Sequence, residues 1–239
     1  MNIEQYYFEI NRKSQDIFSR SMKSPVLQSK AHSFATDWNE LIFCLDQKDE
    51  RAMMSVVCSQ VETASLSISL GLYRSAFCAL RLGFEIGVAA IYFSANKLAF
   101  REWQLGSDLG DIKWSTIMDE NSGVLSPRFI SAFFPELLPH VGTYYSRSKE
   151  CFRFLSEYVH GNNDTWTATG ISLSYNAALE EAFSERLNDV VEILMFIFCC
   201  RYLKQLDVVS LDKLQPVILE TFTHIEPIRV LIGNSGDIK

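Results

Sequence analysis

The stretch YRSAFCALRLGFEIGVAAIYFSANK, residues 73–97, decides the fold. Apolar side chains recur every three or four residues in it, which places them on one stripe of a helix. The stripe consists of Ala76, Leu80, Phe84, Val88 and Ile91. Small side chains that let a second helix approach closely lie between them, at Ala79, Gly83, Gly87 and Ala90. The stretch therefore predicts a central helix in a packed helical protein.

The residues on either side of this stretch extend the same pattern. Residues 50–71 repeat apolar and small side chains and end at Gly71, which predicts a helical hairpin with the central helix. Periodicity predicts helices over residues 3–22, 32–46, 50–71, 73–103, 126–134, 138–160, 176–206 and 211–223. Residues 106–126 are rich in Gly, Asp and Ser and predict an irregular connection with a short helix over 112–118.

Composition points to the same fold class. The chain of 239 residues is 48% hydrophobic, with 17 Phe but only 6 Pro and 11 Gly, which favours packed helices. We therefore expect an all-α protein, an antiparallel helical bundle formed by one domain over residues 1–239. The exception is the segment near residues 162–175, where imperfect alternation around Gly170 predicts an irregular loop or a short β-hairpin.

The sequence also indicates a cytoplasmic protein. Its longest apolar runs, residues 86–95 and 193–200, fall short of the about 20 residues that cross a bilayer, so we expect no membrane span. The N-terminus carries acidic residues and no cleavage site of the signal-peptide type. The six Cys lie inside apolar helical patterns without a C-x-x-C pair, which indicates reduced thiols; the adjacent Cys199 and Cys200 point apart on a helix and are not expected to bridge.

Several classes of site are disfavoured. The four His are scattered, and no H-E-x-x-H sequence or glycine-rich phosphate-binding loop occurs, so we expect no metal and no cofactor. The net charge of −7 argues against a broad basic surface for nucleic acid but leaves room for a local one. Within the apolar central helix, Arg81 and Glu85 lie four residues apart and predict a structural ion pair.

The stretch SKECFRFLSEYVHGNND, residues 148–164, carries the candidate site. Offsets of 0, 3, 4 and 7 place four polar side chains on one face of a helix: Arg153, Ser156, Glu157 and His160. Gly161, Asn162 and Asn163 follow as a helix stop. A purely structural interpretation is also open, because a His in the last turn often caps carbonyl groups and a Glu pairs with an Arg four residues away.

The spacing from Arg153 to His160, with six residues between them, resembles the signature of the HEPN superfamily, an Arg followed about four to six residues later by a His in a helical bundle. The segments YRSAFCALRLGFE (73–85) and FRFLSEYVHGN (152–162) also resemble, in order and context, the two halves of helical HEPN-like proteins of bacterial toxin–antitoxin and phage-defence systems. The resemblance covers roughly residues 50–205. The helices of 1–48 and 210–225 are then expected to pack on that core.

Many HEPN proteins are metal-independent ribonucleases, and the resemblance implies such an activity on RNA. His160 would then transfer a proton, Arg153 would bind the phosphate, and Glu157 or Ser156 would orient them. One His per chain implies a homodimer in which two such helices face each other. The best candidates for a local substrate-binding surface are the cations Arg147 and Lys149, with Arg128, and the amides Asn162 and Asn163.

One residue departs from the family pattern. The position after the Arg is often Asn, Asp or His in the family, but here it is Phe154, which is typical of a core position. Members without catalytic activity keep the fold and bind partners. An alternative function is therefore a catalytically silent helical module that binds a protein such as an antitoxin or a nucleotidyltransferase, and a purely structural dimer is a third.

Overall fold

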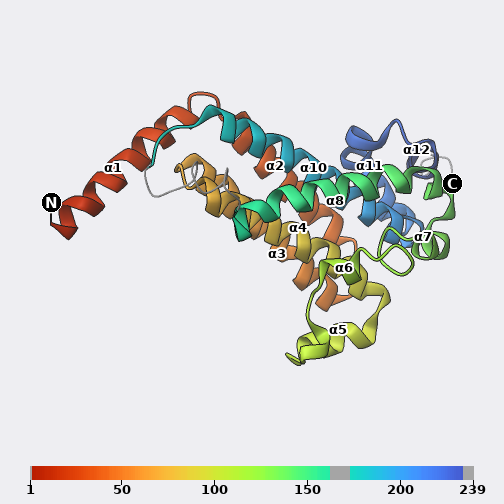
Figure 1. The fold of residues 1–239 in the computed structure, drawn as a ribbon. Coiled ribbons are helices and arrows are strands. Elements are labelled where there is room, and N and C mark those ends of the chain that lie inside the picture. The colour runs from red at the N-terminus through yellow and green to blue at the C-terminus, as the bar shows by residue number, and fades with distance from the viewer. Residues whose placement is uncertain (1, 162–172, 234–239) are drawn as a thin grey trace.

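The computed structural model describes residues 2–161 and 173–233 (Figure 1). These residues form helices and contain no strand, which confirms the prediction of an all-α protein. The longer helices are α1 (Ile3–Ser21), α2 (Val26–Phe43), α3 (Lys48–Ser69), α4 (Tyr73–Ala95), α8 (Leu138–His160), α10 (Ala177–Tyr202) and α11 (Val208–Phe222). The short ones are α5 (Lys97–Gln104), α6 (Trp114–Ile117), α7 (Pro127–Phe133) and α12 (Glu226–Gly233), with 3-10 turns at Asp108–Gly110, Pro135–Leu137 and Leu203–Gln205.

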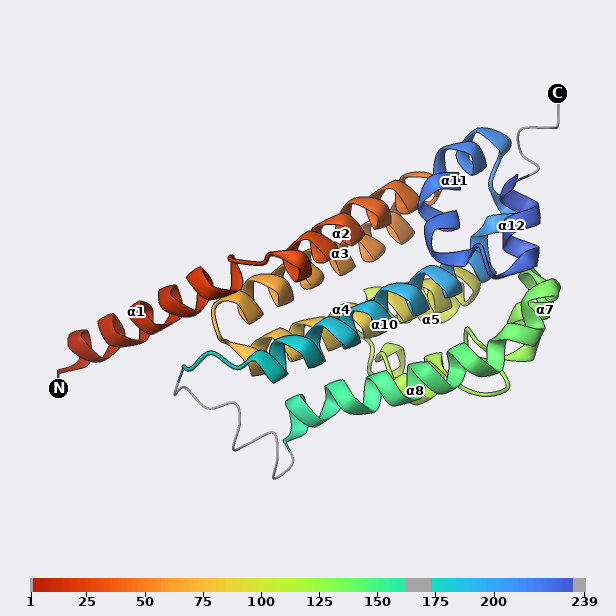
Figure 2. The same cartoon turned by 90° about the horizontal axis from the view of Figure 1, so that it is seen from above.

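Helices α3 and α4 form the predicted hairpin, and its turn depends on a glycine. Gly71 has φ +78°, and a Cβ at this position would lie 2.6 Å from Ile17 Cδ1 of α1. Both the positive φ and this close approach require the absence of a side chain. Helix α2 packs on α3, while α8 and α10 pack on α4, so α4 lies at the centre of the bundle (Figures 1 and 2).

The small residues of α4 bring its neighbours close, as expected from the sequence. A Cβ at Gly87 would lie 2.7 Å from Leu194 Cδ2 of α10 and 3.2 Å from Val57 Cγ2 of α3. About 15 Å nearer the start of α4, the fully buried ring of Phe77 stacks on Tyr158 of α8 at 3.9 Å and meets Phe183 of α10 edge-on at 5.5 Å. The core of the protein is therefore built where α3, α8 and α10 converge on α4.

Helix α4 is also the one helix in the described residues whose length and composition would suit a membrane span. In its most apolar window, 61% of the residues are buried inside the bundle. Most of its apolar side chains therefore pack against α3, α8 and α10.

Some helix boundaries differ from those predicted. The helix expected over residues 73–103 ends at Ala95, because Asn96 leaves the helical region (φ −122°, ψ 70°) and its side chain donates to Tyr92 O at 2.9 Å. Helix α2 begins at Val26, directly after Pro25, earlier than periodicity indicated. Helix α12 was not predicted. Most of the segment expected to form a hairpin, residues 162–172, lies outside the described residues.

Helix α1 differs from the others because most of it leaves the bundle (Figures 1 and 2). Of its 19 residues only Ile17 and Ser21 are buried. Its C-terminal half is attached by a hydrogen bond from Ser14 Oγ to Leu70 O, 2.9 Å long, and by one from Ser21 to Glu180. The N-terminal half of α1 therefore projects as an arm.

Candidate functional site

The candidate site lies on the last two turns of α8. One face of α8 buries Cys151, Leu155 and Tyr158 toward the core, whereas Arg153 and His160 are exposed on the other. The helix ends as predicted at Gly161, which has φ +77° and donates its N–H to Glu157 O at 2.9 Å. His160 follows Arg153 by seven positions, so their Cα atoms lie about 10 Å apart along the helix.

The side chains of Arg153 and His160 differ from their neighbours in their lack of polar partners among the described residues. Within residues 2–161 and 173–233, neither side chain takes part in a hydrogen bond or an ion pair. Glu157, one turn after Arg153, is half-buried on the same face. The structure therefore keeps a guanidinium and an imidazole accessible on one side of a rigid helix, which is what binding of a phosphate and transfer of a proton require.

Ser156 has a different environment from the one its spacing suggested. Its hydroxyl donates to Phe152 O at 2.7 Å and accepts from Arg81 Nε of α4 at 3.0 Å. The Arg81 guanidinium pairs with Glu85 at 3.3 Å and lies 4.5 Å over the ring of Phe152. Because the hydroxyl is engaged by Phe152 and Arg81, Ser156 joins α8 to α4, whereas the sequence analysis expected it to orient His160 and Arg153.

Arg147 is likewise engaged by acidic side chains. Its two terminal nitrogens donate to the two carboxylate oxygens of Glu192 at 2.7 and 2.8 Å, and one of them also donates to Asp189 at 2.9 Å. The hydroxyl of Tyr144 donates to Glu192 at 3.0 Å. Two carboxylates neutralise the guanidinium, so Arg147 holds α8 against α10, an environment unlike that of the unpaired phosphate-binding cation expected from the sequence.

The acidic partners on α10 were missed by the sequence analysis. Arg186 of the same helix also pairs with Asp189, at 3.0 Å. The available signal was the spacing of Arg186, Asp189 and Glu192 at every third residue, which places them on one side of a largely apolar helix. Such spacing identifies a polar face but not the helix that it meets.

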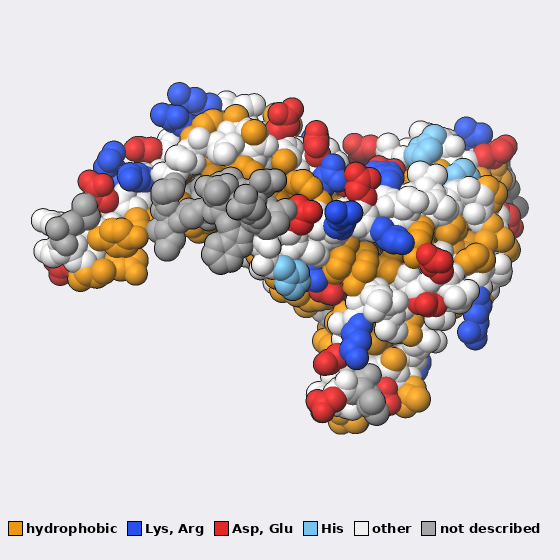
Figure 3. Space-filling model, viewed as in Figure 1, with side chains coloured by type: hydrophobic (Ala, Val, Ile, Leu, Met, Phe, Trp, Pro, Cys, Tyr) orange, Lys and Arg blue, Asp and Glu red, His pale blue; other side chains and the backbone are white. Residues whose placement is uncertain are grey.

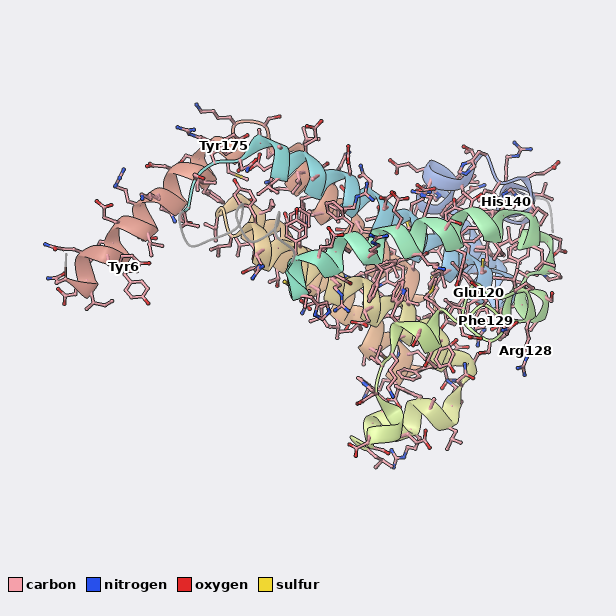
Figure 4. All side chains as sticks on the ribbon, in the orientation of Figure 1. Tyr6, Glu120, Arg128, Phe129, His140 and Tyr175 are labelled. Atoms are coloured by element: carbon pink, nitrogen blue, oxygen red, sulfur yellow. The ribbon has the colours of Figure 1, made fainter. Side chains whose placement is uncertain are left out.

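The remaining candidate residues are spread along the molecule. Lys149 is exposed one turn before Arg153, with its ammonium 5.3 Å from the centre of the Tyr145 ring. Arg128 lies on α7, beside the other end of α8 and about 30 Å from His160 by helix length (Figure 4). It therefore does not join the site. Asn162 and Asn163 lie outside the described residues.

Where the structure is described, no cluster of three or more His, Cys, Asp or Glu has the arrangement of a metal site.

The contact of Arg147 with Glu192 predicts a stability that depends on pH. The hydrogen bonds from Arg147 lower the pKa of Glu192 below its ordinary value, although burial acts in the opposite direction. A carboxyl whose pKa is lower in the folded chain stabilises the fold above its unfolded pKa of about 4.3, and this stabilisation is lost as the pH falls through the folded pKa. Glu192→Gln is expected to lower the free energy of unfolding by about 1–3 kcal/mol at pH 7.

Urea unfolding of the wild type and Glu192→Gln, at several values between pH 7 and pH 3, measures this difference. It should shrink as the pH falls. The exposed Glu150 of α8 provides the matched control, since Glu150→Gln is expected to change stability by less than about 0.5 kcal/mol. A difference between wild type and Glu192→Gln that stays constant down to pH 3 would contradict the role given to the carboxylate.

Comparison of the chain with protein-family models, with curated proteins and with solved structures gives no match.

Proposed function

We propose that the protein is a dimeric, metal-independent endoribonuclease of the HEPN type, acting in a toxin–antitoxin or phage-defence setting. One observation carries the proposal. Arg153 and His160 remain exposed and outside the ion pairs of the described residues, whereas Arg81, Arg147 and Arg186 nearby are each held by carboxylates. The resemblance of residues 73–85 and 152–162 to HEPN-like proteins supports the same activity.

The chemistry needs a base, an acid and a cation. A neutral His160 takes the proton of a ribose 2′-OH, whose oxygen attacks the adjacent phosphorus. The bond from phosphorus to the 5′-oxygen breaks, and a protonated imidazole donates a proton to that leaving oxygen. The products are a 2′,3′-cyclic phosphate and a 5′-OH. Arg153 binds the two non-bridging oxygens and stabilises the charge that develops on them.

The second imidazole comes from the other chain of a two-fold dimer. Ser156 and Glu157 are the midpoint between Arg153 and His160 along α8. When two copies of α8 cross antiparallel at this midpoint, Arg153 of each copy lies opposite His160 of the other. One imidazole then acts as the base and the other as the acid at a single shared site. The side chain of Val159, 40% exposed beside His160, provides an apolar contact for this pairing.

Mixed dimers test the shared site. If cleavage needs His160 from both copies, a dimer of one wild-type chain and one His160→Ala chain should be inactive. A tenfold excess of variant during co-refolding is expected to leave roughly one tenth of the wild-type activity, because random pairing leaves few wild-type dimers. The control adds the same excess immediately before the assay, which detects competition for RNA. Undiminished activity in co-refolded samples would refute the shared site.

The alternative is a catalytically silent module that binds a protein partner, and the observation that favours it is Phe154. This residue is half-buried, and its ring lies 5.9 Å from that of Phe77 and 5.6 Å from that of Tyr158. At the position where family members often carry a polar residue, this chain therefore has a side chain that packs against other aromatic rings. Purified wild-type dimer that leaves RNA intact at micromolar concentration, with or without added divalent metal, would favour the module over the nuclease.

A further inference from the structure

The arm formed by the N-terminal half of α1 carries an uncovered apolar surface. The stripe of α1 that packs on the bundle through Ile17 continues outward through Ile10, Tyr7 and Ile3. Tyr7 is 63% and Phe8 73% exposed, and Tyr6 points into solvent (Figure 4). Hydrophobic side chains accordingly gather on one side of the arm (Figure 3). An apolar surface of this extent indicates a partner.

The same chain has an uncovered apolar groove. A cavity of about 820 Å³ opens between α2, α10 and α11. Its apolar lining includes Val26, Phe34, Leu187, Val191, Met195 and Val217. Lys30 lies near the middle of the α2 side, and Asp37 lies at its end with Glu220 of α11. Burial and the charges of Glu220 and Glu40 raise the pKa of Asp37, so this end of the groove favours a cation.

The arm and the groove match in length and charge. The groove follows α2 from Pro25 to Asp37, about 18 Å, and the arm from Ile3 to Lys13 is about 15 Å long. With the two helices parallel and Lys13 of the arm level with Asp37, Glu4 lies within about 3 Å of the level of Lys30, so both charges face an opposite one. The chain's own arm does not enter its own groove, because α1 is attached beside the α3–α4 turn and runs away from α2 (Figure 2).

We propose that two copies of this chain exchange their α1 arms, each arm lying in the groove between α2, α10 and α11 of the other copy. Helix-in-groove contacts of this kind are anchored by apolar side chains on one helical face. The aromatic rings of a single arm can bury on the order of 400 Å² of surface. A stable interface buries roughly 800 Å² on each partner, so one arm alone is too small. Reciprocal exchange doubles the contact and closes the assembly as a two-fold dimer.

The test is the mass of the full chain, measured by light scattering and analytical ultracentrifugation over a dilution series. Tyr7→Ser removes an anchor from the arm, and Ser33→Trp fills the groove from an exposed position on α2. Each is expected to raise the concentration at which the dimer dissociates by at least about tenfold, since one buried aromatic anchor contributes that much or more. The matched controls, Gln15→Ser on the solvent side of α1 and Ser33→Ala, should dissociate as the wild type does.

The double variant Tyr7→Ser/Ser33→Trp shows whether the arm meets the groove. If both substitutions act on one contact, the rise in dissociation concentration of the double variant should fall well short of the product of the two single rises, whereas independent positions would give the full product. A monomeric wild type, or effects of the two substitutions that combine in full, would overturn the exchange. A wild-type dimer whose dissociation neither Tyr7→Ser nor Ser33→Trp changes would also overturn the exchange, and it would leave the proposed shared site on α8 standing, so the two failures are distinguishable.

Discussion

Replacing His160 with alanine is expected to lower the rate of RNA cleavage at least about 100-fold, because proton transfer by a positioned side chain contributes on the order of 10²–10⁴. The side chain is exposed and in the last turn of α8, so little packing is lost. The free energy of unfolding should therefore change by less than about 0.5 kcal/mol. Loss of activity without loss of stability separates a catalytic imidazole from one that caps the helix.

Cleavage is measured with an end-labelled oligoribonucleotide, and a strand with 2′-deoxyribose at the cleaved position should resist. His140→Ala is the matched control, because His140 lies on the first turns of the same helix, at the end remote from the site (Figure 4). EDTA should leave the rate unchanged, since neither the base nor the acid is a metal-bound water. Cleavage by His160→Ala at the wild-type rate would exclude the imidazole from the reaction.

Replacing Phe77 with alanine is expected to lower the free energy of unfolding by about 3–5 kcal/mol, the range for a buried Phe. Phe77 has no exposed surface, and its ring touches Phe154 and Tyr158 of α8 and Phe183 of α10. Its removal leaves a cavity where three helices meet. Because the same contact holds the last turns of α8, RNA cleavage should also fall in the folded fraction of the variant.

Urea denaturation followed by circular dichroism gives the stability, and Leu82→Ala is the matched control. Leu82 lies on the same helix but is 43% exposed, so its truncation should cost less than about 1 kcal/mol. Equal losses for the two variants would mean that the α4–α8 contact is not a centre of stability.

The boundaries of α8 illustrate what a local pattern can predict. Apolar residues every three or four positions and the stop at Gly161 fixed this helix at Leu138–His160, and small residues in α4 predicted the close approach seen at Gly87. Propensity and periodicity act within a few residues, so they are readable along the chain. The break at Asn96 was missed because the apolar pattern continues past it into α5.

The sequence by itself determined that the protein is all-helical, that α4 is central, and that Arg153, Ser156, Glu157 and His160 share one side of α8. Only the tertiary structure decided what each side chain meets. It turned Ser156 toward Arg81, placed Arg147 between two carboxylates, and left Arg153 and His160 exposed. The physical reason is that helical spacing fixes the direction of a side chain about its own axis, whereas its neighbours belong to helices packed from distant segments.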